Sequence, residues 1–446
     1  MLAALVATLV VLLNLDAPLV EDGLFWWVPK ALWMSENGFS VVLDQLPAAA
    51  DPTGELPPQW QGGLPDYAHP PLWYAWMALF LKLPLKVHHA VHVAAIPMAA
   101  AFGWGCAALL RRVGGDRAAW TAVVLPLVPP IAAQLLRADT DLPLLAATPW
   151  CLVFILDRRD APFALLAALA TWCKEPGILL AAPALAACVL DRRVGWGWLA
   201  PPVALAAWAG VHYAATGWGL AGTERLPETL GHWLSDLGTV LWIVVCDQWR
   251  WVLLPLAAFG LWRWTPRRRA LALLGVHTVV QLLFFGTLNF LGGIDRLDAY
   301  THVRYLLPGL VGWLVMVLAV APPAATVLTV VSVVFLHRPS VHGPESSLYG
   351  LDVARAVRDT ELPLDQGPVW VGSYAWTQLT RPYAGVVDHP VEGLHVYGHE
   401  TDPADVSGYV VEACEGEPLG RIQERSLREV SRTEVRHAWV RVLLVE

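Results

Sequence analysis

Long apolar stretches separated by short polar turns fill the first three quarters of the chain. Several are shorter than the roughly 20 residues that an upright helix needs to cross a bilayer, so their boundaries are approximate. The pattern predicts an all-α polytopic membrane domain with about 11 transmembrane helices. The apolar stretches lie at about 1–14, 88–110, 118–136, 142–156, 161–173, 177–190, 196–215, 249–264, 270–291, 304–321 and 324–336.

Arginines in the short turns set the orientation of these predicted spans. They fall on one side of the threaded chain, which the positive-inside rule assigns to the cytoplasm together with the N-terminus. The threading requires two further apolar pieces, 71–83 and about 230–245, to lie on the outer surface as juxtamembrane helices. The arginines are Arg111, Arg112, Arg117, Arg158, Arg159, Arg192, Arg193, Arg263, Arg267, Arg268 and Arg269.

The pattern changes at about residue 338, where the chain becomes polar. Strand-like runs at 369–374, 409–413 and 438–445, together with a helix-like stretch at 417–428, predict a small α/β domain over 338–446. An odd number of spans in the membrane domain, 1–337, places this C-terminal domain outside the cytoplasm. It then shares a compartment with the predicted outer loop 15–87.

Composition agrees with a multi-pass protein of the cell (inner) membrane, since 56% of the residues are hydrophobic, 15% are charged and 24 are Trp. The net charge of −8 and the absence of a basic stripe exclude nucleic acid as a partner. The six cysteines show no CxxC spacing, which argues against a zinc site or a disulfide framework. His88, His89 and His92 lack a second ligand cluster at zinc-site spacing and are interpreted as one helix face.

An acidic pair, Glu21 and Asp22, follows the first apolar stretch directly. A carboxylate at the outer membrane edge is suited to act as a general base. We predict Asp22 as the base, with Glu21 as the second choice. The alternative is that the pair caps a helix that begins at Gly23.

Further ionisable groups reach the same predicted face. Asp139 and Asp141 are candidates for orienting an acceptor or the base, or else they cap the span that begins near Leu142. Lys174 interrupts a long apolar run, where a charge is costly unless it reaches water or an anion. It is therefore a candidate ligand for a phosphate, and the alternative is a snorkelling lysine paired with Glu175.

Three more residues are candidates for binding a phosphate. Arg304 and His302 begin a late span at its outer end, and a guanidinium matches phosphate oxygens bidentately. The alternative for Arg304 and His302 is an interfacial anchor. His69 either contacts the phosphate or ties down its own loop.

Five short motifs in order along residues 1–321 resemble the type C glycosyltransferases that use polyprenyl-phosphate sugars. The resemblance is to the branch with the protein O-mannosyltransferases and the lipid A aminoarabinose transferases. Each motif alone is weak, but five in order on one topology are fairly specific. They are the acidic pair within 20–31, His69-Pro70-Pro71-Leu72-Trp73-Tyr74, Arg137-Ala138-Asp139-Thr140-Asp141, Lys174-Glu175-Pro176-Gly177 and Arg304-Tyr305-Leu306-Leu307-Pro308.

The resemblance implies an inverting transfer of a sugar from a polyprenyl-phosphate donor to an extracytoplasmic protein, lipid or glycan. Asp22 would be the base, while Lys174, Arg304, His69 and His302 hold the phosphate. No cofactor or metal is expected if these cations supply the charge. An oligosaccharyl branch uses a divalent ion instead, which Asp22 with Asp139 or Asp141 could bind.

The chain departs from the family in the order of the acids, which is commonly Asp-Glu, and in having His92 where an Arg often stands. One competing class is a transporter or flippase for a lipid-linked or small polar substrate, because an intramembrane lysine also suits a pathway. The chain shows no internal repeat, and its polar candidates gather at one face, which favours the enzyme. A third class is a membrane scaffold without catalysis.

Overall fold

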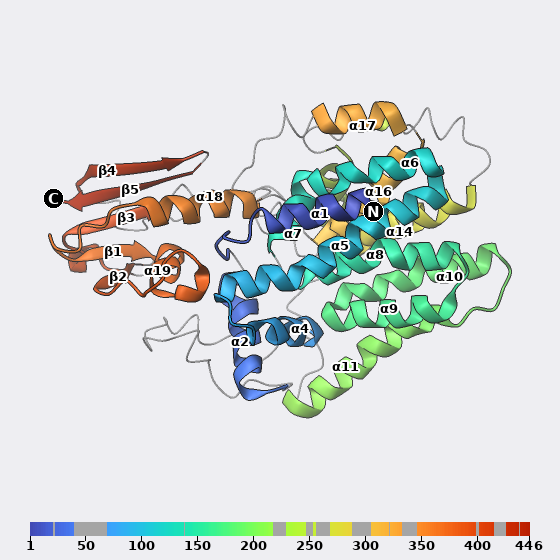
Figure 1. Cartoon of the computed structure of the whole chain (residues 1–446), viewed down its shortest axis with the longest axis horizontal. Coiled ribbons are helices and arrows are strands. Elements are labelled where there is room, and N and C mark those ends of the chain that lie inside the picture. The colour runs from blue at the N-terminus through green and yellow to red at the C-terminus, as the bar shows by residue number, and fades with distance from the viewer. Residues whose placement is uncertain are drawn as a thin grey trace.

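The protein consists of a helical body and a smaller domain built around a β-sheet (Figure 1). This computed structural model confirms a mostly helical chain with a small C-terminal α/β domain. The residues that it describes are 1–20, 23–39, 69–137, 139–216, 229–246, 253–255, 268–287, 305–320, 322–331, 346–397, 401–413, 425–436 and 438–446.

The helices of the body follow the predicted apolar stretches closely, because each apolar run ends at Gly, Pro or charged residues that stop a helix. The body contains α1 (Leu2–Leu12), α2 (Val28–Asn37), α4 (Leu72–Leu81), α5 (Val87–Gly114), α6 (Asp116–Thr121), α7 (Pro129–Arg137), α8 (Asp141–Leu156), α9 (Asp160–Cys173), α10 (Ala181–Leu190), α11 (Ala200–Thr216), α12 (Leu230–Leu241), α14 (Arg268–Thr287), α16 (Leu307–Val320) and α17 (Pro322–Val331). Single turns of tighter or wider helix, named η, extend several of them.

Few of these helices are long enough to cross a bilayer by themselves. Among the described residues only α5 and the 268–285 part of α14 are both long and apolar enough, and a bent pair formed by 116–127 and α7 makes a third. The predicted count of about 11 spans is therefore not confirmed. The bend of 63° in that pair has a local cause: Val128 precedes Pro129 and is extended, so the helix ends and restarts there.

The two stretches predicted to lie on the outer surface are both short helices. α4 is 10 residues long, too short for an upright span, and it packs on α2 and α5 with Trp73 and Tyr74 buried. α12 leaves most of its side chains exposed or half-buried, and it continues into η5 (Trp242–Cys246). Their lengths fit the juxtamembrane prediction, and their depth in the membrane stays a prediction.

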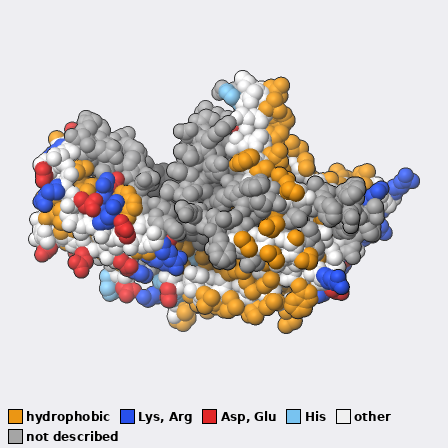
Figure 2. Space-filling view, turned by 90° about the horizontal axis from the view of Figure 1, so that it is seen from above, with side chains coloured by type: hydrophobic (Ala, Val, Ile, Leu, Met, Phe, Trp, Pro, Cys, Tyr) orange, Lys and Arg blue, Asp and Glu red, His pale blue; other side chains and the backbone are white. Residues whose placement is uncertain are grey.

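Small residues let the helices approach one another closely in the body. α1 lies along α5, where a Cβ on Gly103 would overlap the backbone of Ala3. Large apolar side chains such as Leu5, Trp104 and Leu165 remain exposed on the outside. Figure 2 shows hydrophobic side chains gathered over the helical body and charges of both signs over the sheet domain. This division is typical of a membrane domain attached to a domain in water.

The C-terminal domain is a five-stranded mixed sheet in the order β2-β1-β3-β5-β4. β1 pairs in parallel with β2 and β3, whereas β5 is antiparallel to β3 and β4. Helix α18 packs on β5 and β4, and α19 packs on β1 and β2. Their bounds are α18 (Ser346–Asp359), β1 (Val369–Gly372), α19 (Ser373–Thr380), β2 (Leu394–Tyr397), β3 (Tyr409–Ala413), β4 (Leu427–Val435) and β5 (Ala438–Val445).

Two predictions for this domain need correction. The strand predicted over 369–374 ends at Gly372, because α19 begins at the next residue. The helix predicted over 417–428 is wrong at its end, since Leu427 already belongs to β4, and 417–424 lies outside the described residues. β4 pairs along its length with β5 and bulges between Glu429 and Ser431, and its residues are exposed or half-buried throughout, so burial imposes no alternation on its sequence.

The sheet domain is docked on the helical body through a shared core. Ala17, Val20 and Leu136 of the body are buried together with apolar residues of α18, α19 and the sheet. α18 also contacts α7 directly. The segment that leads into the acidic pair is thus held between the body and the C-terminal domain.

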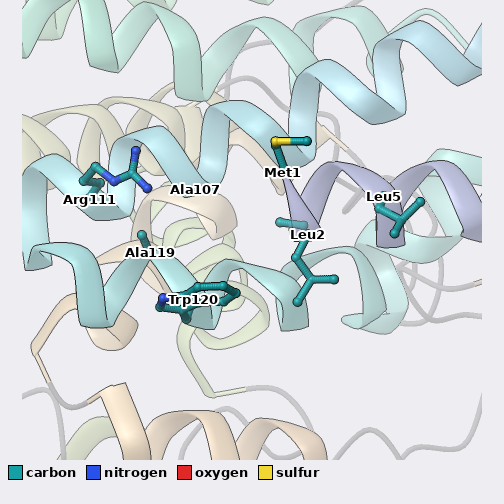
Figure 3. Close-up of a pocket in the computed structure, with 8 residues that line it drawn as sticks. Met1, Leu2, Leu5, Ala107, Arg111, Ala119 and Trp120 are labelled. Carbon is teal, nitrogen blue, oxygen red and sulfur yellow. The ribbon is translucent and has the colours of Figure 1, made fainter.

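A cavity of about 560 Å³ lies between α1, α5 and α6. Figure 3 shows Leu2 beside Trp120, with Met1 above them, Leu5 further along α1 and Arg111 on the opposite side of the view. Arg111 is the one charged residue among those that line it, and it pairs with Asp116 at 3.0 Å. Its described lining residues include no carboxylate, so they offer no general base, and the candidate catalytic site is built from other residues.

Candidate active site

Lys174 occupies a break between two helices. It follows α9 directly, has an extended backbone and precedes η3 (Glu175–Leu180). The chain folds back tightly there, because a Cβ on Gly177 would lie only 2.6 Å from the backbone nitrogen of Thr171. The Lys-x-x-Gly turn therefore places Lys174 in the break between the two helices. Pro176 prevents α9 from continuing through the turn.

The ammonium of Lys174 forms a buried ion pair with Asp141. Their Nζ and Oδ1 atoms are 2.5 Å apart, and the two side chains are 2% and 7% exposed. The ring of Tyr305 lies against the same ammonium, with 4.1 Å between Nζ and the ring centroid. The alternative of a snorkelling lysine paired with Glu175 is wrong, because the side chain is buried and its carboxylate comes from α8.

Glu175 pairs instead with His69, which lies just before α4. The His69 Nδ1 and Glu175 Oε2 atoms are 2.8 Å apart, with both side chains about one fifth exposed. The ring of Trp27 packs beside His69 at 5.2 Å between centroids. His69 thus ties its loop to the Lys174 turn, as one of its two predicted alternatives proposed, and contact with a phosphate stays a prediction.

Asp139 organises the start of α8. Its Oδ1 accepts hydrogen bonds from the Asp141 backbone nitrogen at 2.9 Å and from the Gln134 side-chain amide. Its Oδ2 lies 2.8 Å from Nε of Arg137 in a pair that is almost fully buried. Neither acid is the N-cap of α8, which is Thr140: Asp139 accepts from the first amide of the helix, and Asp141 is the first residue of the helix and turns toward Lys174.

Four predicted site residues, Glu21, Asp22, His302 and Arg304, lie outside the described residues. Their chain neighbours are informative. Tyr305, which follows Arg304, contacts Lys174. Gly23, which follows Asp22, lies against Arg137, since a Cβ there would be 3.5 Å from the Arg137 carbonyl oxygen.

The C-terminal domain holds the chain on both sides of the acidic pair. Before the pair, the Leu19 amide donates to the carbonyl of Ala384 at 2.8 Å, and the Gln378 side chain donates to the Leu19 carbonyl at 2.9 Å. After the pair, the hydroxyl of Tyr383 donates to the Leu24 carbonyl at 3.0 Å. The two side-chain contacts each join positions 359 residues apart, so no local pattern predicts them.

An apolar groove of about 480 Å³ is lined by chain neighbours of the two paired residues. It is formed by α4, α5, α8 and α9, with Trp76, Trp150 and Leu169 among the residues of its lining. The groove reaches Cys173, the residue before Lys174, and Pro143, two residues after Asp141. A buried polar centre with an adjoining apolar groove is suited to a ligand that has a charged head and a hydrocarbon chain.

Residues 68–216 match the family described as dolichyl-phosphate-mannose-protein mannosyltransferase. The matched segment contains His69, Asp139, Asp141 and Lys174 and most of the groove. The match confirms the predicted resemblance to type C glycosyltransferases and fits the apolar helices of a membrane transferase. No curated protein matches the chain at a significant level.

Some residues at this centre escaped the prediction. Tyr305 and Glu175 belong to recognised motifs, but their contacts with Lys174 and His69 depend on how the helices pack. Apart from this centre, Lys30 in α2 is also fully buried. Its signal was available, because a lysine within the apolar surroundings of Val28 to Trp33 is costly to bury and marks a functional candidate.

Proposed function

We propose that this protein transfers a sugar from a polyprenyl-phosphate donor to an acceptor with inversion at the sugar carbon. The observation that carries the proposal is the buried Lys174–Asp141 pair, with an apolar groove lined by its chain neighbours Cys173 and Pro143, inside the segment that matches the mannosyltransferase family. The groove would take the prenyl chain, and the ammonium would face the phosphate.

In the proposed reaction Asp22 takes the proton of an acceptor hydroxyl or amine. The acceptor then attacks the sugar carbon opposite the phosphate, the bond between that carbon and the phosphate oxygen breaks, and the lipid phosphate leaves with one more negative charge. Cations near the leaving phosphate lower the barrier because they stabilise charge that develops in the transition state.

Lys174 cannot supply that charge alone, because Asp141 already balances it. Likewise Arg137 is balanced by Asp139, and His69 faces Glu175. A further cation is therefore needed, and we assign this role to Arg304. The contact of Tyr305 with Lys174 supports the assignment, since Tyr305 is the next residue in the chain. Asp141 positions the lysine.

The decisive experiment replaces the proposed base. Asp22→Asn keeps the shape of the side chain but removes the proton acceptor, so the transfer rate of the purified enzyme in a reconstituted assay should fall by about 10²–10⁴-fold. The matched control is Glu21→Gln, which should retain at least partial activity. Comparable turnover of Asp22→Asn and the parent enzyme would refute Asp22 as the base.

A further inference from the structure

Three potential metal ligands meet where α1 and α5 approach the C-terminal domain. Asp16 lies shortly after α1, and His88 and His89 lie in the first turn of α5. One ligand atom from each lies within 4.8 Å of the others. The His89 Nε2 and Asp16 Oδ1 atoms are 2.7 Å apart, and the two histidine rings are 4.2 Å apart between centroids.

His88 gives the cluster a second, independent feature. Its side chain is only 5% exposed, and its Nδ1 atom is buried without a hydrogen-bond partner in the part of the chain that the structure describes. A buried ring nitrogen without a partner is costly, so the fold holds this histidine in place without a hydrogen bond to Nδ1 from the described residues. The C-terminal domain closes over this ring at Gly385, where a Cβ would lie 2.7 Å from His88 Cγ.

The surroundings hold the ligands in place. His92 Nε2 donates to the carbonyl of Ala17 at 2.9 Å, which fixes the residue next to Asp16. The nearby cation Lys86 is balanced by Asp388 at 2.5 Å, so the cluster retains the negative charge of Asp16. Imidazole nitrogens and a carboxylate are ligands that suit zinc. A water molecule can complete a four-coordinate site.

We propose that Asp16, His88 and His89 form a binding site for one zinc-like divalent ion at the junction of the two domains. The ion replaces the proton between His89 and Asp16, and that proton moves to the other nitrogen of the His89 ring. The bound ion links the segment after α1 to the start of α5. Its ligand Asp16 lies five residues before Glu21, the first residue of the acidic pair. The site is separate from the proposed transfer reaction and stands independently of it.

Zn²⁺ and Co²⁺ binding to the full-length protein in detergent tests the site, at a pH above the usual imidazole pKa of about 6.5. After dialysis the parent should retain about one equivalent of Zn²⁺ and should bind Co²⁺ with visible absorption bands. It should not bind Mg²⁺ at this site, because Mg²⁺ prefers oxygen ligands. Asp16→Asn and His89→Asn should each weaken the affinity by at least about tenfold. Asp16 is exposed, so its variant is expected to fold.

The matched control is His395→Asn, an exposed histidine of β2 that stacks on Trp370 away from the cluster. It should bind Zn²⁺ like the parent. Equal Zn²⁺ retention by the parent, Asp16→Asn and His89→Asn would place the ion elsewhere and overturn the proposal. Failure of the parent to bind Zn²⁺ more tightly than His89→Asn would overturn it as well.

Discussion

The buried ion pair between Lys174 and Asp141 provides the sharpest test of the site, because it separates a structural role from phosphate binding. We consider Asp141→Asn, Lys174→Met and the double variant. Each single change leaves one buried charge without its partner, whereas the double change removes both charges and keeps similar volumes. A pair that only stabilises the fold and a pair that also binds a phosphate respond differently to the double change.

The magnitude follows from the geometry. At 2.5 Å the two charges attract by about 7 kcal/mol at an effective dielectric constant of about 20, and desolvation opposes much of this gain. Removing one partner of such a buried pair typically costs about 3–5 kcal/mol of unfolding free energy. Asp141→Asn also leaves the ammonium with the ring of Tyr305 among the described residues, a contact of about 1 kcal/mol. The double variant should cost clearly less than the sum of the two single variants.

Unfolding free energies in mixed micelles, titrated with a denaturing detergent, provide the stability measurement, and a donor-binding titration accompanies it. The double variant should regain stability but not donor affinity. An exposed pair with the same separation, Lys86 and Asp388, is the matched control and should change stability far less. Additive losses within about 0.5 kcal/mol would refute the coupling. Unchanged donor affinity in Lys174→Met would refute the role in phosphate binding.

Two further predictions concern contacts that lie far apart in the sequence. Tyr383→Phe removes the hydrogen bond to the Leu24 carbonyl and should lower the transfer rate several-fold. The control, Tyr397→Phe, loses an equivalent buried hydrogen bond within the sheet domain and should keep the rate of the parent. Equal rates in both variants would contradict a positioning role for the domain. Hydrogen bonds from Arg269, assisted by Arg158, lower the pKa of Asp191 below its ordinary value of 3.8. Its stabilising effect is therefore complete above that value and is lost as the pH falls through the lowered pKa, so the stability difference between the parent and Asp191→Asn should shrink on acidification in unfolding titrations. A difference that grows in acid would contradict this sign.

The sequence was sufficient for the architecture wherever the information is local. Apolar runs bounded by Gly, Pro and charges predict most helices of the body to within a few residues, and β3 and β5 match their predicted runs. Lys174 was recognisable because an ionisable residue in an apolar run needs a reason to be there. The contact of Asp139 with the start of α8 was recognisable because such hydrogen bonds depend on neighbouring residues, although the N-cap itself is Thr140.

Length and burial were less predictable. Eleven apolar stretches do not give eleven long helices in the described residues, because local breaks such as the extended Val128 before Pro129 divide an apolar run that hydropathy alone counts as one span. β4 was missed because its residues are exposed or half-buried throughout, so burial imposes no alternation on its sequence, and the pairing with β5 is what defines it as a strand.

Partner choice was decided by the tertiary structure alone. The sequence offers Glu175 as the nearest carboxylate to Lys174, yet the turn at Gly177 directs the lysine to Asp141 and leaves Glu175 to His69. Asp16 joins His88 and His89 only because α1 lies along α5. A sequence specifies which groups are costly to bury, but the packing of distant segments decides which groups compensate one another, since charges and hydrogen bonds act over a few ångströms.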